Sequence, residues 1–315
     1  MALSAAALAM VGLTACGGGK TTPTSDAPTA VATAAPVSNP AASAAVLPGT
    51  RYYLEKTSNN YRIHAVRGSS DVVVHELPFV TYGCEANTLT VSPDGKRVAW
   101  VQDSTDGNVS GVLMAGTIGK PGATRLLDDV SCLDSRALVW QGGDLLMVHK
   151  KTRESVLFDV AANKRVDGDP GQETDRCWSV DGRWLAAMDD RHKPYVTDGT
   201  QSRHYSYTPR KEEAAHWGGW RAQSVSMDGR YVSVGWDGTD PSRRDDSFAV
   251  VDTTTSKVVD LPGGGEIRSI MFTADDKVIV KRATGISVLD SSFTPLGTVE
   301  EPAALRNMTL LAYAA

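Results

Sequence analysis

Four arginines are the side chains of this protein whose type and spacing best fit a binding site. Arg136, Arg221 and Arg268 each stand seven residues before the aspartate or glycine that marks a short turn, and Arg306 falls at the corresponding place near the C-terminus. Convergent guanidinium groups bind carboxylates or an acidic peptide segment. Trp220 precedes Arg221, and an aromatic ring beside an arginine is typical of binding hot spots. These five residues form the candidate binding site.

A structural role for the same residues is the alternative. Asp134 lies two residues before Arg136, and Glu266 lies two residues before Arg268. Residues i and i+2 of a strand share one face, so local salt bridges would satisfy both guanidinium groups without a ligand. Tryptophan is, on average, a highly buried residue, so Trp220 also fits a packing role. Both interpretations stay open at this point.

The sequence contains no signature of catalysis or of metal binding. It has no Gly-x-Ser-x-Gly turn, and no glycine-rich segment leads from a strand into a helix to hold phosphate. The six histidines form no pair at metal-ligand spacing, and the acidic segments 103–108 and 237–240 do not follow the regular calcium loop. We therefore expect no catalytic residue, no metal site and no cofactor.

A repeated turn must position these side chains. Residues 92–95 read Ser-Pro-Asp-Gly, and related turns occupy 179–182, 226–229 and 273–276. The aspartates at 181, 228 and 275 are each 47 residues apart, whereas Asp94 precedes Asp181 by 87, which leaves room for a further copy at 139–144. Serine, proline and glycine favour these places in type I turns, so each turn connects two strands.

Short apolar runs accompany every turn. They follow it at 97–101, 145–148, 184–188, 231–234 and 278–280, and they recur farther on at 112–115, 156–160, 248–252 and 286–290. About four short strands in 40 to 50 residues are typical of a β-propeller blade. Five turns define five blades. The apolar runs 51–54, 61–66 and 308–313 are not part of these five blades.

Pairing the last of these runs with the first hairpin completes a sixth blade and leaves no unpaired sheet edge. We therefore predict an all-β fold, a six-bladed β-propeller over residues 50–315 that is closed by the C-terminal strand. A single β-sandwich with coincidental turns is the alternative.

The segment 91–100, in which Val-Ser-Pro-Asp-Gly-Lys leads into a short hydrophobic strand, resembles the repeat of the TolB-type, WD40-like propellers. The resemblance covers about residues 50 to 315, and only this first copy carries the full signature. It implies a six-bladed architecture. Because such repeats occur in periplasmic scaffolds, in bacterial lipoproteins and in non-catalytic propellers of peptidases, it does not imply an activity.

The N-terminal segment predicts export and lipidation. Residues 1–15 are small and apolar and end in Leu-Thr-Ala before Cys16, which resembles a bacterial lipobox, so we interpret them as a lipoprotein signal peptide. Lipidation of Cys16 would anchor the protein to the extracytoplasmic face of the cell membrane. The following residues up to 49 are mainly Gly, Thr, Ser, Ala and Pro, a composition typical of a disordered tether.

Two cysteines occupy nearly equivalent places in neighbouring repeats. Cys84 lies 10 residues before Asp94, and Cys132 lies 11 residues before Gly143. An oxidising compartment would permit a disulfide between them. Cys177 lies beside a tryptophan in an expected inner strand, and we interpret it as a buried core residue.

The net charge of −5 and the lack of any cationic run give no indication of nucleic-acid binding. We expect a monomeric, non-enzymatic scaffold in the cell envelope that binds a protein or peptide. Binding of a small anionic or carbohydrate ligand at an arginine-lined tunnel mouth is the first alternative. An enzyme that processes a polymer is the second.

Overall fold

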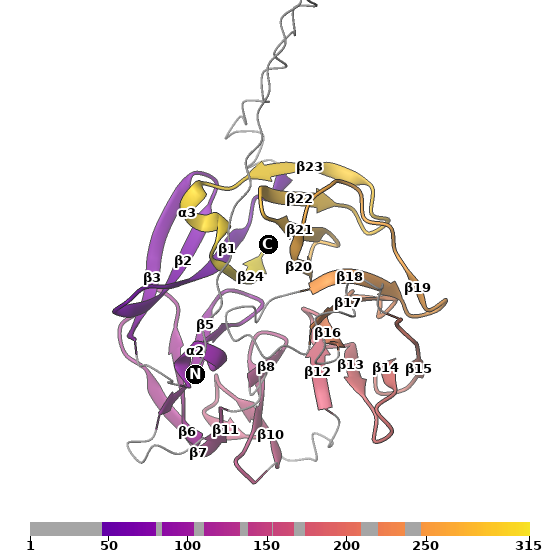
Figure 1. Ribbon diagram of the computed structural model, residues 1–315. Helices are drawn as coiled ribbons and strands as arrows, with labels where there is room; N and C mark the ends of the chain where they lie inside the picture. Colours follow the sequence, from indigo (N-terminus) through magenta and orange to yellow (C-terminus); the bar gives the residue numbers. More distant parts are fainter. Residues whose placement is uncertain are drawn as a thin grey trace, which may run out of the picture. The chain divides into compact units, whose positions relative to one another are not determined.

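The computed structural model describes residues 46–79, 84–103, 110–132, 138–152, 154–166, 174–208, 220–236 and 247–315. The chain divides into two units, 1–37 and 38–315, and all described residues belong to the second. Within them, the strands form six four-stranded sheets that surround a central axis as blades (Figure 1). The predicted six-bladed β-propeller is confirmed. The predicted signal peptide, Cys16 and the tether as far as residue 45 lie outside the described residues.

In five blades the strands run from the axis outward in chain order. The first blade consists of β4 (Thr90–Val91), β5 (Arg97–Asp103), β6 (Ser110–Thr117) and β7 (Thr124–Ser131). The second consists of β8 (Leu138–Gln141), β9 (Leu145–His149), β10 (Ser155–Asp159) and β11 (Lys164–Arg165). The third consists of β12 (Thr174–Trp178), β13 (Leu185–Met188), β14 (Pro194–Thr197) and β15 (Ser202–His204). The fourth consists of β16 (Trp220–Val225), β17 (Tyr231–Trp236), β18 (Ser247–Asp252) and β19 (Lys257–Val258). The fifth consists of β20 (Ile267–Phe272), β21 (Val278–Arg282), β22 (Gly285–Leu289) and β23 (Pro295–Glu300).

The sixth blade joins the two ends of the described chain. It contains β1 (Thr50–Lys56), β2 (Asn60–Arg67), β3 (Ser70–Pro78) and, nearest the axis, β24 (Thr309–Ala314). β24 pairs antiparallel with β1, so strands from opposite ends of the sequence share one sheet. Two short helices precede innermost strands: α2 (Glu85–Thr88) precedes β4, and α3 (Ala303–Arg306) precedes β24. No helix among the described residues is long and apolar enough to cross a membrane.

A hydroxyl–carboxylate pair holds the turn between the first and second strands in four blades. Ser92 donates to Asp94 over 2.6 Å, Ser179 to Asp181 over 2.6 Å, Ser226 to Asp228 over 2.7 Å, and Thr273 to Asp275 over 2.7 Å. Each of these hydroxyls also accepts the backbone N–H at the start of the next strand, at 2.8–3.0 Å. The four turns therefore share one bonding pattern, as their common sequence predicts.

The fourth residue of every turn has a left-handed backbone. Its φ is +69° at Gly95, +73° at Gly182 and +68° at Gly229, and the last copy places Asp276 there at +55°. Space also favours glycine, because each turn packs against the preceding blade: a Cβ would lie 2.6 Å from Tyr52 at Gly95, 2.9 Å from Gly142 at Gly182 and 2.2 Å from Trp184 at Gly229. The glycines thus permit both the turn and the close stacking of blades.

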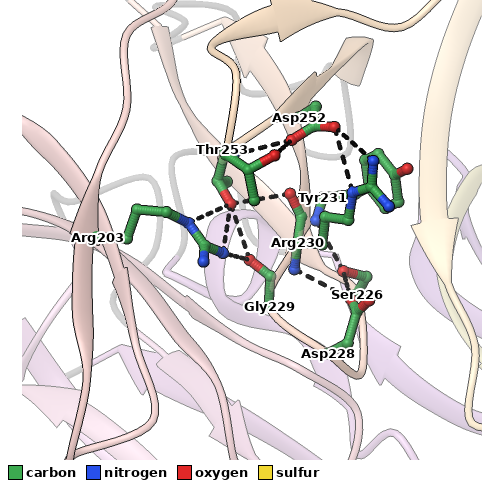
Figure 2. A network of polar contacts seen from close by, with 9 residues as sticks. Arg203, Ser226, Asp228, Gly229, Arg230, Tyr231, Asp252 and Thr253 are labelled. Carbon is green, nitrogen blue, oxygen red and sulfur yellow. Dashed lines mark hydrogen bonds and ion pairs between the residues drawn. The ribbon is translucent and has the colours of Figure 1, made fainter.

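Polar contacts reinforce this stacking between the third and fourth blades. Figure 2 shows Arg203 of β15 reaching across to Thr253, which follows β18. Its Nη2 donates to Thr253 Oγ1 over 2.7 Å and to the carbonyl of Gly229 over 3.0 Å. Within the fourth blade, Arg230 forms an ion pair with Asp252 at 3.0 Å (Figure 2). One outer strand is therefore bonded directly to the neighbouring turn.

Buried charged groups lie where the fifth blade meets the sixth. The Tyr53 hydroxyl of β1 donates to Glu301, and Lys281 of β21 donates to the carbonyls of Leu305 and Met308. Tyr53, Lys281 and Glu301 are at most 1% exposed. Burial raises the pKa of Glu301, although Lys281 and Tyr53 act in the opposite direction. Paired groups of this kind are costly to separate, because each would leave an unsatisfied partner in the interior.

Candidate binding site in the central channel

The six innermost strands enclose a cavity of about 210 Å³ along the propeller axis. It extends from the turns, at Pro93 and Val180, to the opposite face, at Asn87 of α2. Every blade contributes to its wall, for example through Thr90, Val139, Trp178, Gln223, Met271 and Leu311. The innermost strands predicted from the turns are therefore the strands that line the channel.

The wall of this channel is uncharged throughout its described part. Its polar groups are amides and hydroxyls, such as those of Asn87, Gln223 and Thr309, and its apolar groups include Met271 and Leu311. A ligand charge would meet no opposite charge on this wall and would lose hydration on entering it. The channel therefore suits neutral groups that combine apolar surface with hydrogen-bonding atoms.

The described arginines of the candidate site do not line the cavity. Arg221 is buried, with 3% of its surface exposed. Arg268 Nη1 donates to the Arg306 carbonyl over 3.2 Å and to Asn307 Oδ1 over 3.3 Å. These contacts tie β20 to the segment that leads into β24. Arg136 lies outside the described residues.

Arg306 lies in the helical turn that precedes the closing strand. It is the last residue of α3, three residues before β24 begins, just as Asn87 of α2 lies three residues before β4. Its Nε donates to the Glu301 carbonyl over 2.9 Å, and its Nη2 lies 3.5 Å from a carboxylate oxygen of Glu300. These contacts hold the Arg306 guanidinium against the segment that leads out of β23.

Strand irregularities explain why equal spacing does not give equal orientation. In the pairing of β20 with β21, Ile267 lies opposite Arg282 and Ser269 lies opposite Lys281. Arg268 is the extra residue of a bulge and has no partner on β21. In β16 the corresponding shift lies between Ala222 and Ser224, so Arg221 stays in the ladder opposite Gly235. A bulge inserts one residue and redirects the side chains around it. Arg221 and Arg268 therefore point into different surroundings.

Trp220 is a packing residue of the fourth blade. Its ring meets Tyr207 edge-on with centroids 5.2 Å apart and lies 6.3 Å from the ring of Tyr205. It is half-buried against the cluster that also contains Ala222 and Val234. This is the alternative that the sequence left open for Trp220.

The two equivalent cysteines lie at the start and at the end of the first blade. Cys84, directly before α2, and Cys132, directly after β7, form a disulfide with a Cα–Cα distance of 5.1 Å. Both are buried in the cluster that contains Leu138 and Trp140 of β8. The bond therefore fixes the segment that carries Asn87 to the end of β7, and the shared cluster packs both cysteines with Trp140. The side chains of Asn87 and Trp140 line the channel.

Sequence reasoning missed the channel-lining residues themselves. Gln223, Met271 and Thr309 do not belong to a recognisable motif; the available signal was their position on the strand before each turn. The described residues contain no group of three or more His, Cys, Asp or Glu side chains that could hold a metal ion. The candidate site is therefore the uncharged channel.

Comparison with known proteins gives likenesses of fold. No protein-family model matches the chain, and no curated protein matches it. TolB from Acinetobacter baumannii is similar in structure, with a TM-score of 0.49 and 15% identity over 85% of this chain and 67% of that chain. The β-propeller domain of the Trilobed protease from Pyrococcus furiosus gives a TM-score of 0.46 and 10% identity over 80% of this chain and 86% of that chain. These likenesses say nothing about activity or partners. The six four-stranded sheets themselves show that the protein is a six-bladed β-propeller.

Proposed function

We propose that this protein is a non-enzymatic binding scaffold of the bacterial cell envelope that holds a protein or peptide partner at its central channel. The observation that carries the proposal is the uncharged wall to which all six blades contribute. Peptide segments present neutral amides together with apolar side chains, and this wall offers partners for both.

The location is part of the same proposal. Cys16, in its lipobox-like sequence, would carry the lipid, and the segment up to residue 45 would tether the propeller to the membrane. The disulfide between Cys84 and Cys132 supports an oxidising compartment, because such bonds persist outside the cytosol. A protein of this kind would sample partners near the membrane surface as a monomer.

Photocrosslinking in intact cells tests the scaffold function. A photoreactive residue in place of Gln223 or Trp178 should label one specific envelope protein or peptide. The same residue in place of the exposed Leu296, on the outer strand β23, is the control and should not label that partner. Labelling from the channel positions that yields no specific partner would contradict the proposal.

Metabolic labelling with a fatty-acid analogue tests the anchor separately. The unmodified protein should incorporate the label and sediment with membranes, and Cys16→Ala should do neither. A wild-type protein that takes up no label and does not sediment with membranes would contradict the lipid anchor. The crosslinking experiment would then still test the binding role independently.

A further inference from the structure

The mouth of the channel at the four turns carries a repeated apolar residue. The second residue of each turn is apolar: Pro93, Val180, Met227 and Ala274. Pro93 and Val180 line the cavity, and Met227 and Ala274 hold the same place in turns with the same hydroxyl–carboxylate bond. We call these four residues the apolar rim.

The apolar rim is accessible. Pro93, Val180 and Met227 are half-buried and Ala274 is exposed, so none of these side chains is fully buried in the core of a blade. Inside the rim the wall continues with Val91 and Met271, which are also apolar. An apolar group that enters at the turns therefore meets apolar surface at the mouth and beyond it.

Charged side chains follow the apolar rim residue in each turn. Lys96, Arg183 and Arg230 have 75%, 71% and 50% of their side chains exposed, whereas in the fourth turn Lys277 is less exposed than its partner Asp275, at 22% against 32%. The carboxylates with which the first three cations pair, those of Asp94, Asp181 and Asp252, are 30%, 23% and 11% exposed and accept further hydrogen bonds from their own turns. In these three pairs the cation is the member that a partner would meet first.

An apolar centre within a charged ring is the usual anatomy of a protein-binding surface. The cavity volume of about 210 Å³ leaves room for an apolar side chain. The exposed cations favour acidic residues on either side of that side chain.

We propose that the apolar rim is the docking mouth and that its occupant is an extended peptide segment with one apolar residue flanked by acidic residues. The inference rests on the proposed scaffold function and names the face and the chemistry of the partner. The apolar side chain enters between Pro93 and Val180, while the flanking carboxylates meet Lys96, Arg183 and Arg230.

Fluorescence anisotropy with the full-length protein and dye-labelled acetyl-Glu-Glu-Leu-Glu-Glu-amide tests the inference. Val180→Asp and Met227→Asp should each weaken binding at least tenfold, because they place a carboxylate in the rim. Leu296→Asp is the matched control, since it makes the same change at an exposed apolar residue of β23 and should leave the affinity unchanged. Thermal unfolding of each variant checks that the propeller is intact.

The peptide is varied in parallel. Replacing its leucine by asparagine should weaken binding at least tenfold, and a lysine-flanked version should bind at least tenfold more weakly at low salt, with a smaller difference at high salt. The inference that the apolar rim is the docking mouth would be overturned if the leucine peptide did not bind the wild-type protein. It would also be overturned if the peptide bound Val180→Asp as tightly as the wild type. Equal binding of the lysine-flanked peptide would overturn the requirement for acidic flanks.

Failure of the inference can be separated from failure of the scaffold function. A photoreactive residue in place of Val180 probes the rim, and one in place of Asn87 probes the opposite end of the channel. A specific partner labelled from Asn87 and not from Val180 would leave the scaffold function standing and place the docking mouth elsewhere. No specific partner from either end would contradict both.

Discussion

The hydroxyl of Ser226 donates to Oδ1 of Asp228 over 2.7 Å and accepts the backbone N–H of Tyr231 over 2.8 Å. The same two bonds recur around Ser92, Ser179 and Thr273. A single hydroxyl thus fixes the carboxylate of the turn and the first amide of the next strand. The repeated turn is therefore a stabilising element as well as a marker of the fold.

Ser226→Ala should lower the free energy of unfolding by about 1–2 kcal/mol, because it removes both hydrogen bonds of the hydroxyl, the one to Asp228 and the one from the Tyr231 N–H. Urea denaturation measures the change. Ser292→Ala, at an exposed serine of the turn between β22 and β23, is the control and should change stability by less than about 0.5 kcal/mol. Equal effects of the two variants would contradict the role of the hydroxyl.

The turn carboxylates should make stability depend on acid. Burial acts to raise the pKa of Asp94 and of Asp181, but hydrogen bonds from Ser92 and Ser179 and the neighbouring cations outweigh it, and both pKa values lie below the ordinary range. A carboxyl whose folded pKa is depressed adds stability above its unfolded pKa and loses it as the pH falls through the folded pKa. Melting temperatures should therefore decline below about pH 4.

Asp94→Asn and Asp181→Asn together should flatten that decline, since neither amide titrates. Melting curves recorded from pH 7 to pH 2 compare the double variant with the wild type. A decline of the same steepness in both proteins would mean that other groups set the acid sensitivity.

The sequence predicted the turns and the hidden second blade because both depend on local bonding. The pairing of the last strand with the first hairpin followed from the need to leave no sheet edge unpaired. Ser-Pro-Asp-Gly encodes its own turn geometry, and the gap between Asp94 and Asp181 located β8 and β9. The outermost strands were missed. β11, β15 and β19 are two or three residues long, and β3, β7 and β23 are largely exposed. Their pairing is imposed by the neighbouring strand.

The binding surface was harder to predict than the fold. Equal spacing of Arg221 and Arg268 suggested a shared orientation, but the bulges of β16 and β20 fall at different residues. A one-residue shift reverses the face to which a side chain points. Nothing in the local sequence distinguishes the two bulges, so the spacing could not show which residues face the channel.

Arg268 should act as a structural residue. Arg268→Met keeps the aliphatic stem and removes the bonds to the Arg306 carbonyl and Asn307, so we expect a loss of about 1 kcal/mol in unfolding free energy. Crosslinking of the partner from channel positions should be unchanged. Loss of the crosslink with unaltered stability would instead assign Arg268 to the binding surface.

Removal of the disulfide should destabilise the first two blades. In the chain-entropy estimate, a bond that closes a loop of 48 residues contributes about 4 kcal/mol, so Cys84→Ser with Cys132→Ser should lower the unfolding free energy by up to that amount. Reductant should lower the stability of the wild type and leave the double variant unchanged. A response of both proteins to reductant would mean that the effect does not come from this bond.

Gly229, like the other turn glycines, meets two constraints, a left-handed backbone and a close neighbour, which Gly199 and Gly264 allow to be tested separately. Its φ of +68° disfavours any Cβ, and the added carbon would lie 2.2 Å from the Trp184 ring. Gly229→Ala should therefore cost more than about 2 kcal/mol, whereas Gly199→Ala, with φ of +87° and no atom within 4 Å, should cost only the backbone strain of about 1–2 kcal/mol. Gly264→Ala, which has neither constraint, should be neutral or slightly stabilising. Urea denaturation of the three variants should give that order, and an equal cost at Gly229 and Gly199 would show that the contact between the turn and the preceding blade contributes nothing.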